Sequence, residues 1–374
     1  MNQSPFTAFD HQMMARAIAL AKQGIYTTAP NPNVGCVITV GQEIIGQGAH
    51  LKAGEPHAEV HALCQAGDKV KGATAYVTLE PCSHYGRTPP CAEALVKARV
   101  SRVVCAMQDP NPQVAGRGIA MLRQAGIQVD VGLLEADAIA LNPGFIKRMK
   151  TGMPYVQLKL AASLDGKTAL ANGHSQWITS PQARQDVQRY RAKAGAILST
   201  AKTVLDDDAS LNVRWQELPQ DIQAQYSAPS LRQPVRVILD RQQQLSEHPK
   251  LKLFHSEGDL LLVGQDTGLA ENQVVAALDH NQQFDLPKLL KQLAEEHNIN
   301  HIWVEAGATL ATNLITQQLI DELIIYMAPK LMGTDGRGLT QIAGFTEMKQ
   351  ALDLNITDLR MVGKDLRITA CLNQ

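Results

Sequence analysis

Four residues between positions 57 and 91 have the side chains and the order needed for metal-assisted hydrolysis. His57 is followed two residues later by Glu59, and Cys82 and Cys91 come further along the chain. One imidazole and two thiolates can hold Zn²⁺ in a tetrahedral site whose fourth position is left to water, as in catalytic zinc sites. A carboxylate beside that water can move protons. We therefore predict that His57, Cys82 and Cys91 bind one zinc ion and that Glu59 is the catalytic acid/base.

The order His-x-Glu, then Pro-Cys and a second Cys, is typical of zinc deaminases that act on nucleobases. The alternative is a structural zinc site, which would need a fourth protein ligand, and His84 is the candidate for it. Eight residues separate Cys82 from Cys91, where about two are usual in these deaminases. The polar side chains of the inserted segment suggest a loop that reads the substrate.

The composition is that of a soluble globular protein with two domains. A chain of 374 residues is longer than one typical domain, and its 45% hydrophobic and 19% charged residues are ordinary values. The net charge of −1 and the 4% aromatic content argue against a protein that binds nucleic acid. We find no apolar segment that could span a membrane and no signal peptide, and the six cysteines are scattered. These features predict a cytoplasmic protein with reduced cysteines.

The first half of the chain has the pattern of an α/β domain. Strands and helices alternate after an initial hairpin, which favours a largely parallel sheet. His57 and Cys91 fall at the starts of two helices, whose dipoles would stabilise thiolate charge. The expected strands are 34–40, 43–48, 73–79, 102–107 and 127–131, and the expected helices are 9–21, 57–66, 91–98, 118–124 and 137–149.

A turn-rich segment at 150–154 interrupts this pattern and predicts two domains, 1–150 and 151–374. The α/β alternation continues beyond it. The expected strands are 155–160, 196–199, 235–239, 260–263, 301–304, 323–327 and 366–371. The expected helices are 181–193 and 287–297, with two more that end near 206 and 315. The polar segment 216–233 is expected to lie on the surface.

Several polar positions allow two interpretations. Asn31 and Asn33, in a Pro-rich turn before the first strand, could form the turn or hydrogen-bond a pyrimidine edge. Gly307, between a strand and a helix, could form a tight turn or bring helix N–H groups to a phosphate. No Gly-x-Gly-x-x-Gly motif occurs at a strand-to-helix turn. Three basic residues could form an anion pocket or be solvated surface charges: Lys159, Arg191 and Arg214.

Motifs along nearly the whole chain resemble those of the bifunctional deaminase/reductase family of riboflavin biosynthesis. They are Asn-Pro-Asn-Val-Gly, His-Ala-Glu, Pro-Cys-Ser-His-x-Gly-Arg-Thr-Pro-Pro-Cys, Leu-Ala-Ala-Ser-Leu-Asp-Gly and Val-Glu-Ala-Gly. The eight-residue cysteine spacing is also that of the family. The resemblance implies an α/β protein with an N-terminal three-layer α/β/α domain like cytidine deaminases. It also implies a C-terminal domain like dihydrofolate reductase, which would bind a dinucleotide without the Rossmann glycines.

The resemblance also implies two successive reactions. Zinc-dependent hydrolysis would deaminate 2,5-diamino-6-(5-phosphoribosylamino)pyrimidin-4-one, and NADPH would then reduce the ribosyl side chain to ribityl, giving 5-amino-6-(5-phosphoribitylamino)uracil. The expected partner is this small molecule, not nucleic acid or a membrane. A homodimer or higher homo-oligomer through the reductase-like domain is our hypothesis. Two rival hypotheses are a deaminase with an accessory second domain and a zinc-stabilised binding protein without catalysis.

The family's functional positions carry over residue by residue. The zinc ligands and the acid/base coincide with those predicted above. The positions that bind the cofactor match Ala161, Trp177, Thr203, Asp207, Gly307, Ala308, Thr309, Leu310, Ala311, Thr312 and Asn313. The positions that hold the phosphoribosyl substrate match Ser175, Arg191, Leu211, Arg214 and Glu305. The chain departs from the family where Ala161-Ala162 replaces a frequent Ala-Met pair and where Asp208 to Asn212 replaces a Pro and a Thr.

Overall fold

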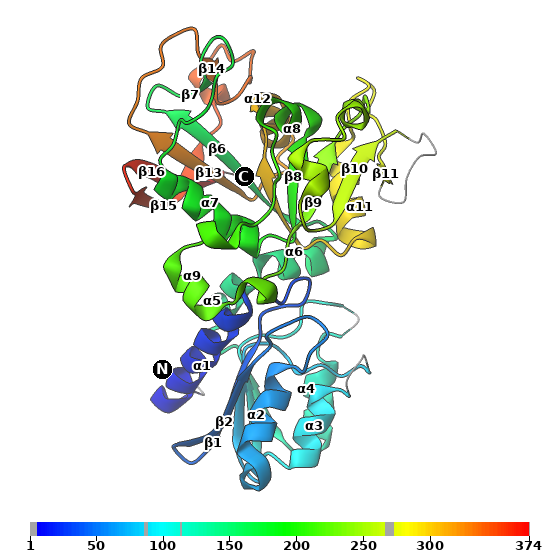
Figure 1. Cartoon of the computed structure of the whole chain (residues 1–374). Helices are drawn as coiled ribbons and strands as arrows, with labels where there is room; N and C mark the ends of the chain where they lie inside the picture. Colours follow the sequence, from blue (N-terminus) through cyan, green and yellow to red (C-terminus); the bar gives the residue numbers. More distant parts are fainter. Residues whose placement is uncertain (1–5, 86–88, 113, 266–272, 374) are drawn as a thin grey trace. The chain divides into compact units, whose positions relative to one another are not determined.

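The computed structural model describes residues 6–85, 89–112, 114–265 and 273–373. The chain forms two compact units, Met1–Met153 and Pro154–Gln374, each with its own sheet (Figure 1). The break between them lies three residues after the predicted one at position 150. Among the described residues, no helix combines the length and the apolar character needed to cross a membrane.

A five-stranded sheet forms the middle layer of the first unit. Its strands are β1 (Gly35–Val40), β2 (Glu43–Ala49), β3 (Thr74–Val77), β4 (Arg102–Cys105) and β5 (Gln128–Val131). They lie in the order β2-β1-β3-β4-β5. β1 pairs antiparallel with both β2 and β3, whereas β3, β4 and β5 are parallel. The predicted hairpin and the parallel strands after it are therefore confirmed.

Helices cover both faces of this sheet. They are α1 (Ala8–Ala21), α2 (Ala58–Ala66), α3 (Cys91–Ala98), α4 (Arg117–Gln124), α5 (Glu135–Leu141) and α6 (Pro143–Thr151). Because successive side chains of a strand point to opposite faces, Val37 and Tyr76 pack with α1, whereas Ile38 and Val77 pack with α2 and α3. Figure 1 shows α1 on one side of the sheet and α2 to α4 on the other. The fold of this unit is the predicted three-layer α/β/α arrangement.

The prediction of one helix over 137–149 was wrong, because the chain forms α5 and α6 with a break at Asn142. Asn142 precedes Pro143, and the residue before a proline is disfavoured in the α-helical conformation; its φ of −135° and ψ of 44° are accordingly not helical. The break gives Asn142 a further role. Its side-chain oxygen accepts the N–H of Asn33 at 2.7 Å, and its amide donates to the carbonyl of Asn33 at 2.9 Å.

A nine-stranded sheet organises the second unit, in the order β11-β10-β9-β8-β12-β6-β13-β16-β15. Its strands are β6 (Tyr155–Ser163), β8 (Ala196–Thr200), β9 (Val235–Leu239), β10 (Leu260–Gly264), β11 (Gln273–Val275), β12 (His301–Glu305), β13 (Glu322–Ala328), β15 (Leu354–Val362) and β16 (Asp365–Leu372). The strands from β11 to β13 are parallel, and β16 and β15 close the sheet antiparallel. β7 (Lys167–Ala169) and β14 (Arg337–Gly338) form a separate pair.

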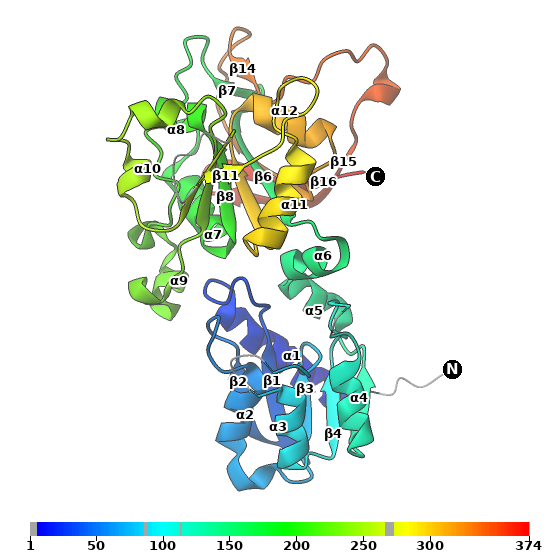
Figure 2. The same cartoon turned by 90° about the vertical axis from the view of Figure 1, so that its right-hand side faces the viewer.

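Helices lie on both faces of this sheet too. They are α7 (Pro181–Lys193), α8 (Ala201–Asp207), α9 (Gln220–Gln225), α10 (Lys252–His255), α11 (Leu286–Glu296) and α12 (Ala308–Thr316). α7, α8 and α10 share a core with Ile197, Trp303 and Ile324 of the sheet, and Figure 2 shows α11 and α12 on the opposite face. The segment 216–233 is only partly a surface segment, because it contains α9 and buries Leu218 and Ile222.

The topology of the second unit fixes where a ligand can meet it. β8, β12 and β6 are parallel neighbours, so their carboxyl ends lie at one edge of the sheet. α8 begins directly after β8, and α12 begins shortly after β12. In open α/β sheets, ligands bind outside the carboxyl ends of the strands. The predicted reductase residues are therefore expected at this carboxyl edge.

Candidate metal centre and carboxyl-edge site

His57, Cys82 and Cys91 bring three ligand atoms together in the first unit. These atoms all lie within 4.8 Å of one another, and Nδ1 of His57 is 3.6 Å from Sγ of Cys82 and 3.3 Å from Sγ of Cys91. A tetrahedral ion with bonds of about 2.05 Å to nitrogen and 2.3 Å to sulfur would separate those atoms by about 3.6 Å. The residues therefore fit zinc. His84 is exposed and does not belong to this cluster, so the structure does not support a four-ligand structural site.

Two helix starts and one strand end position the three ligands. His57 is the residue before α2, and Cys91 is the first residue of α3. Cys82 follows the end of β3, and its sulfur accepts the N–H of Cys91 at 3.3 Å. Hydrogen bonds from Cys91 and His57 lower the pKa of the Cys82 thiol. Thiolate charge, which metal binding requires, is thus favoured at Cys82.

Glu59 lies in the first turn of α2, and only 3% of the residue is exposed. Burial, assisted by the nearby charge of Cys82, raises the pKa of its carboxyl group to about 7. A carboxyl group with a pKa near neutrality can both accept and give a proton at neutral pH. Glu59 is not one of the three clustered ligand residues. Three protein ligands would leave the fourth coordination position of a tetrahedral zinc ion to water, and Glu59 lies in the same buried region as a proton-transfer group.

The two asparagines of the Pro-rich turn have different surroundings. The side-chain amide of Asn33 donates to Asn142 at 3.1 Å, so this residue holds the turn against the end of α5. The amide of Asn31 lies 3.1 Å from Nε2 of His50. The buried His50 ring in turn stands edge-on to that of His57, with 5.3 Å between ring centroids. Pyrimidine binding therefore stays a prediction for Asn31. The structure also places His50 beside the metal ligand His57, although His50 belongs to none of the motifs found in the sequence.

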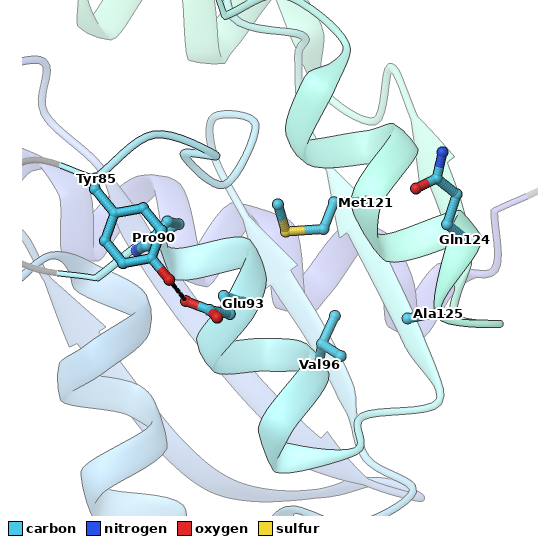
Figure 3. A pocket seen from close by; sticks show the side chains of 7 residues that line it. All are labelled: Tyr85, Pro90, Glu93, Val96, Met121, Gln124 and Ala125. Carbon is cyan, nitrogen blue, oxygen red and sulfur yellow. Dashed lines mark hydrogen bonds between the residues drawn. The ribbon is translucent and has the colours of Figure 1, made fainter.

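Tyr85 lies in the segment between the two cysteines and contacts α3. Its hydroxyl donates to the carboxylate of Glu93 at 2.7 Å (Figure 3). A groove of about 360 Å³ adjoins this contact, lined by Tyr85, Pro90, Glu93, Val96, Met121, Gln124 and Ala125. Arg87 and Thr88, which the sequence suggests as substrate-reading side chains, lie outside the described residues. Within the described part of the segment, Tyr85 is the residue tied to a helix by a side-chain hydrogen bond.

The residues predicted to bind the dinucleotide gather at the carboxyl edge of the second sheet. Ala161 lies near the end of β6, Thr203 and Asp207 lie on α8, and Gly307 to Asn313 form the start of α12. No side chain caps α12, and no heavy atom lies within 4 Å of where a Cβ would stand on Gly307. Helix N–H groups beside such open space suit a phosphate. These residues therefore fit a dinucleotide.

Trp177 projects from the loop before α7, with 64% of the residue exposed. The guanidinium of Arg184 lies 4.4 Å from the centroid of its ring, and Nζ of Lys330 donates to its carbonyl at 2.7 Å. The neighbouring Gln176 donates to Asp207 at 3.1 Å, which ties the loop to α8. The loop thus brings a flat aromatic surface to the carboxyl edge, where a ring system can stack on it.

Arg191 of α7 and Glu305 of β12 form a buried ion pair. Nε and Nη2 of Arg191 donate to the two carboxylate oxygens of Glu305 at 2.6 and 2.9 Å, and Nη1 donates to the carbonyl of Asn212 at 3.0 Å. Burial alone would raise the pKa of Glu305, but the charge of Arg191 outweighs it and lowers that pKa to about 2. Lys159 of β6 stands next to Glu305 in the register, and burial lowers its pKa. Glu305 therefore neutralises the charge of Arg191.

The remaining predicted substrate residues lie close in sequence to these groups but differ in exposure. Arg214 is half-exposed and forms a surface ion pair with Glu217 at 2.6 Å. Leu211 is 2% exposed, so its side chain packs in the core and only its main chain could meet a ligand. Ser175 is half-buried in the loop that carries Trp177. The structure thus separates one buried arginine from one accessible arginine, which the sequence presented as equivalent.

Two family models match the chain, one in each unit. The model of the cytidine and deoxycytidylate deaminase zinc-binding region matches residues 7–107. The model of the RibD C-terminal domain matches residues 154–368. The first match contains all three clustered metal ligands and Glu59, and the second contains the carboxyl edge described above.

Relatives of known name match over nearly the full length. The riboflavin biosynthesis protein RibD of Escherichia coli strain K12 is 54% identical over 361 residues, which is 96% of this chain and 98% of the relative. That of Haemophilus influenzae is 52% identical over 369 residues, covering 97% and 98%. Among solved structures, form 2 of Acinetobacter baumannii RibD has a TM-score of 0.90 and 45% identity, covering 98% of this chain and 99% of the other.

A solved structure with lower sequence identity matches the same share of this chain. It is the diaminohydroxyphosphoribosylaminopyrimidine deaminase/5-amino-6-(5-phosphoribosylamino)uracil reductase of Thermotoga maritima, with a TM-score of 0.82 and 29% identity. The match covers 98% of this chain and 99% of that one. Both units of the chain are therefore similar to one two-domain protein, in the same order.

Proposed function

Because the chain belongs to the family of the riboflavin biosynthesis protein RibD, we propose that Met1–Met153 is its deaminase domain and Pro154–Gln374 its reductase domain. The enzyme is bifunctional, a hydrolase and an oxidoreductase of riboflavin biosynthesis. It deaminates 2,5-diamino-6-(5-phosphoribosylamino)pyrimidin-4-one with zinc and then reduces the ribosyl side chain to ribityl with NADPH. The observation that carries the assignment of the first domain is the cluster of His57, Cys82 and Cys91 beside the buried Glu59.

In the deaminase domain, His57, Cys82 and Cys91 hold the zinc ion. Bound zinc supplies a water molecule whose pKa is lowered to about 7. Glu59 accepts a proton from the attacking water and donates one to the 2-amino group, which leaves as ammonia. The burial of Glu59 and its raised pKa support this role, since the carboxyl group can change protonation state at neutral pH.

In the reductase domain, the start of α12 holds a phosphate of the dinucleotide and Trp177 offers a surface to one of its rings. Bound NADPH supplies the hydride. Arg214 contacts the substrate phosphate, because its surface pair with Glu217 can open at little cost in free energy. Arg191 holds Glu305 in place beside Lys159, which supports a role for these groups at the ribosyl carbon that is reduced.

A coupled assay tests both activities on one chain. The purified enzyme would be given the diaminopyrimidine ribosyl phosphate and NADPH, and ammonia and the nicotinamide absorbance would be followed together. We expect ammonia release followed by loss of NADPH, because the deaminated product is the substrate of the reduction. Ammonia release without NADPH loss would contradict the assignment of the second domain and favour an accessory domain there.

We also propose that the enzyme is a homodimer in the cytoplasm, joined through the reductase domain. The four exposed apolar residues of β15 support the dimer, because the register with β16 puts them on one face of the sheet despite the bulge after Ile356. They are 41%, 57%, 58% and 62% exposed in a single chain: Leu354, Ile356, Leu359 and Met361. A row of this kind marks an interaction surface. None of the six cysteines is paired in a disulfide, which supports a reducing compartment.

Light scattering at working concentration tests the dimer. The wild-type protein is expected at twice the mass of one chain, and Leu359→Asp is expected to shift it to the monomer, because a charge would be buried in the contact. Asn355→Asp, on the other face of the same strand, is the matched control and should remain dimeric. A monomeric wild-type protein, or a dimer that Leu359→Asp leaves unchanged, would contradict this surface.

A further inference from the structure

Glu80 is a buried acidic residue that the proposed mechanism does not use. It is 3% exposed, and its carboxylate accepts four main-chain N–H groups. Oε2 accepts those of Asp109 at 3.1 Å and Gly116 at 2.9 Å, and Oε1 accepts those of Gly118 at 2.9 Å and Ile119 at 3.2 Å. A buried charge is costly unless hydrogen bonds compensate it, and these four bonds supply that compensation. Because burying the Glu80 charge would otherwise be costly, these hydrogen bonds indicate that Glu80 has a specific role in the fold.

The partners of Glu80 belong to the start of α4 and to the loop that leads to it. Gly116 is the residue before α4, and it has no side chain with which to cap the helix. The Glu80 carboxylate therefore caps α4 from another part of the chain, and its charge is favourable at the positive end of the helix. The N–H of Glu80 itself donates to the carbonyl of Met107, just beyond β4, at 3.0 Å. Glu80 thus joins the end of β3, the end of β4 and the start of α4.

The same junction holds the metal ligand Cys82 in place. Glu80 and Cys82 are separated only by Pro81, whose fixed φ stiffens this part of the chain. Gly118 packs so closely that a Cβ there would stand 2.0 Å from the carbonyl oxygen of Pro81. The main chain on the amino-terminal side of Cys82 is therefore clamped by a carboxylate and by close packing against one helix. On the other side, the carbonyl of Cys82 accepts the N–H of Ala92 in α3 at 3.1 Å.

We propose that Glu80 is a positioning residue of the metal centre, which sets the place of Cys82 by fastening the segment before it to the start of α4. The inference rests on the proposed role of Cys82 as a zinc ligand. Residues that orient metal ligands from outside the coordination shell commonly change metal affinity or activity roughly 10–100-fold when they are replaced. Glu80 acts in this way through the main chain and does not touch the metal.

Glu80→Gln tests the proposal with little change of shape. Glutamine keeps one acceptor oxygen but turns an NH₂ group towards two N–H donors, so half of the clamp is lost. We expect zinc affinity, measured by competition with a chelator, to fall roughly 10–100-fold. The visible spectrum of the Co²⁺-substituted enzyme should change, and kcat of deamination should fall more than KM rises. NADPH-dependent reduction, which belongs to the other domain, should keep its wild-type rate.

Asp10→Asn is the matched control for a purely structural effect. Asp10 is also a buried carboxylate of the first domain, 2% exposed, and it accepts hydrogen bonds from Thr7, Tyr76 and Arg102. Asp10 contacts β4 at its first residue, Arg102. Glu80 instead donates its N–H to Met107, which lies just after the last residue of that strand. Asp10→Asn should therefore lower the midpoint of thermal unfolding but keep wild-type zinc affinity and the wild-type Co²⁺ spectrum.

Each outcome decides the proposal. Wild-type zinc affinity and an unchanged Co²⁺ spectrum in Glu80→Gln would overturn it, whatever happens to the thermal stability. If Glu80→Gln does not fold, Glu80→Asp takes its place: it keeps the charge on a shorter side chain and should show reduced affinity, and wild-type affinity in that variant would overturn the proposal. Cys82→Ser tests the role of Cys82 as a zinc ligand, on which the proposal rests. Full zinc retention in that variant would show that Cys82 is not a ligand.

Discussion

Glu59→Gln is expected to abolish deamination while zinc content and NADPH-dependent reduction stay at wild-type levels. The amide cannot accept a proton from water or donate one to the departing amino group, and general acid–base catalysis contributes about 10²- to 10⁴-fold to a rate. In the proposed assignment, three other residues hold zinc and reduction takes place in the other domain. Ammonia release, metal analysis and NADPH oxidation, measured on the same preparation with substrate and with deaminated substrate, check the three parts of this expectation.

Glu135→Gln is the matched control for that experiment. Glu135 lies in the first turn of α5 and is exposed, so the same chemical change there should leave all three measurements at wild-type values. Loss of stoichiometric zinc in Glu59→Gln would contradict its role as acid/base and make it a ligand. Undiminished deamination in a variant that retains zinc would mean that another group moves the protons.

In the Arg191→Ala variant, the reductase domain is expected to unfold more easily, and reduction is expected to stop at working temperature. Removing one partner of a buried ion pair leaves the other charge uncompensated and commonly costs about 3–5 kcal/mol of stability. Here that group is Glu305, which would keep only the neighbouring charge of Lys159 and the indole N–H of Trp303, donated at 2.8 Å. Denaturant unfolding followed through the second domain, together with NADPH oxidation, measures the effect. Deamination should persist where the first domain remains folded.

Two further variants separate structure from substrate binding. Arg191→Met combined with Glu305→Leu removes both charges and should recover much of the stability without restoring reduction. Arg214→Ala removes an arginine whose ion pair is at the surface, so stability should change by less than about 1 kcal/mol. Its KM for the phosphorylated substrate of the reduction should rise. A stable Arg191→Ala with a raised KM as its only defect would contradict the structural role and assign Arg191 to the phosphate.

The sequence predicted the structure correctly where the conformation depends on residues that are close together in the chain. The bounds of α3 and α7 were predicted correctly, because signals close in the chain mark their starts: Pro90 precedes α3, and α7 begins with Pro181 after the capping Ser180. The zinc cluster was predicted for a similar reason. Zinc accepts only a few kinds of ligand atom, so the residue types limit the possibilities before any contact is known. Motif likeness then identified the reductase, although its fold has no short glycine signature.

Contacts between distant parts of the chain decided the rest. The sequence did not distinguish Asn31 from Asn33, because their roles depend on His50 and on Asn142, which lies 109 positions after Asn33. β15 was missed because its apolar face is exposed in the single chain and a bulge interrupts its alternation.

The sequence by itself predicted a zinc site of His57, Cys82 and Cys91 with Glu59 as the acid/base, because that prediction depends only on atom types and short spacings. Only the tertiary structure decided which charged side chains are available to a ligand and which are already paired within the protein. Arg191 is neutralised by Glu305 from 114 positions away, and Glu80 is occupied by N–H groups 29 to 39 positions away. A charged side chain in a sequence has no known partner until folding brings one within about 3 Å, and burial then makes that partner obligatory.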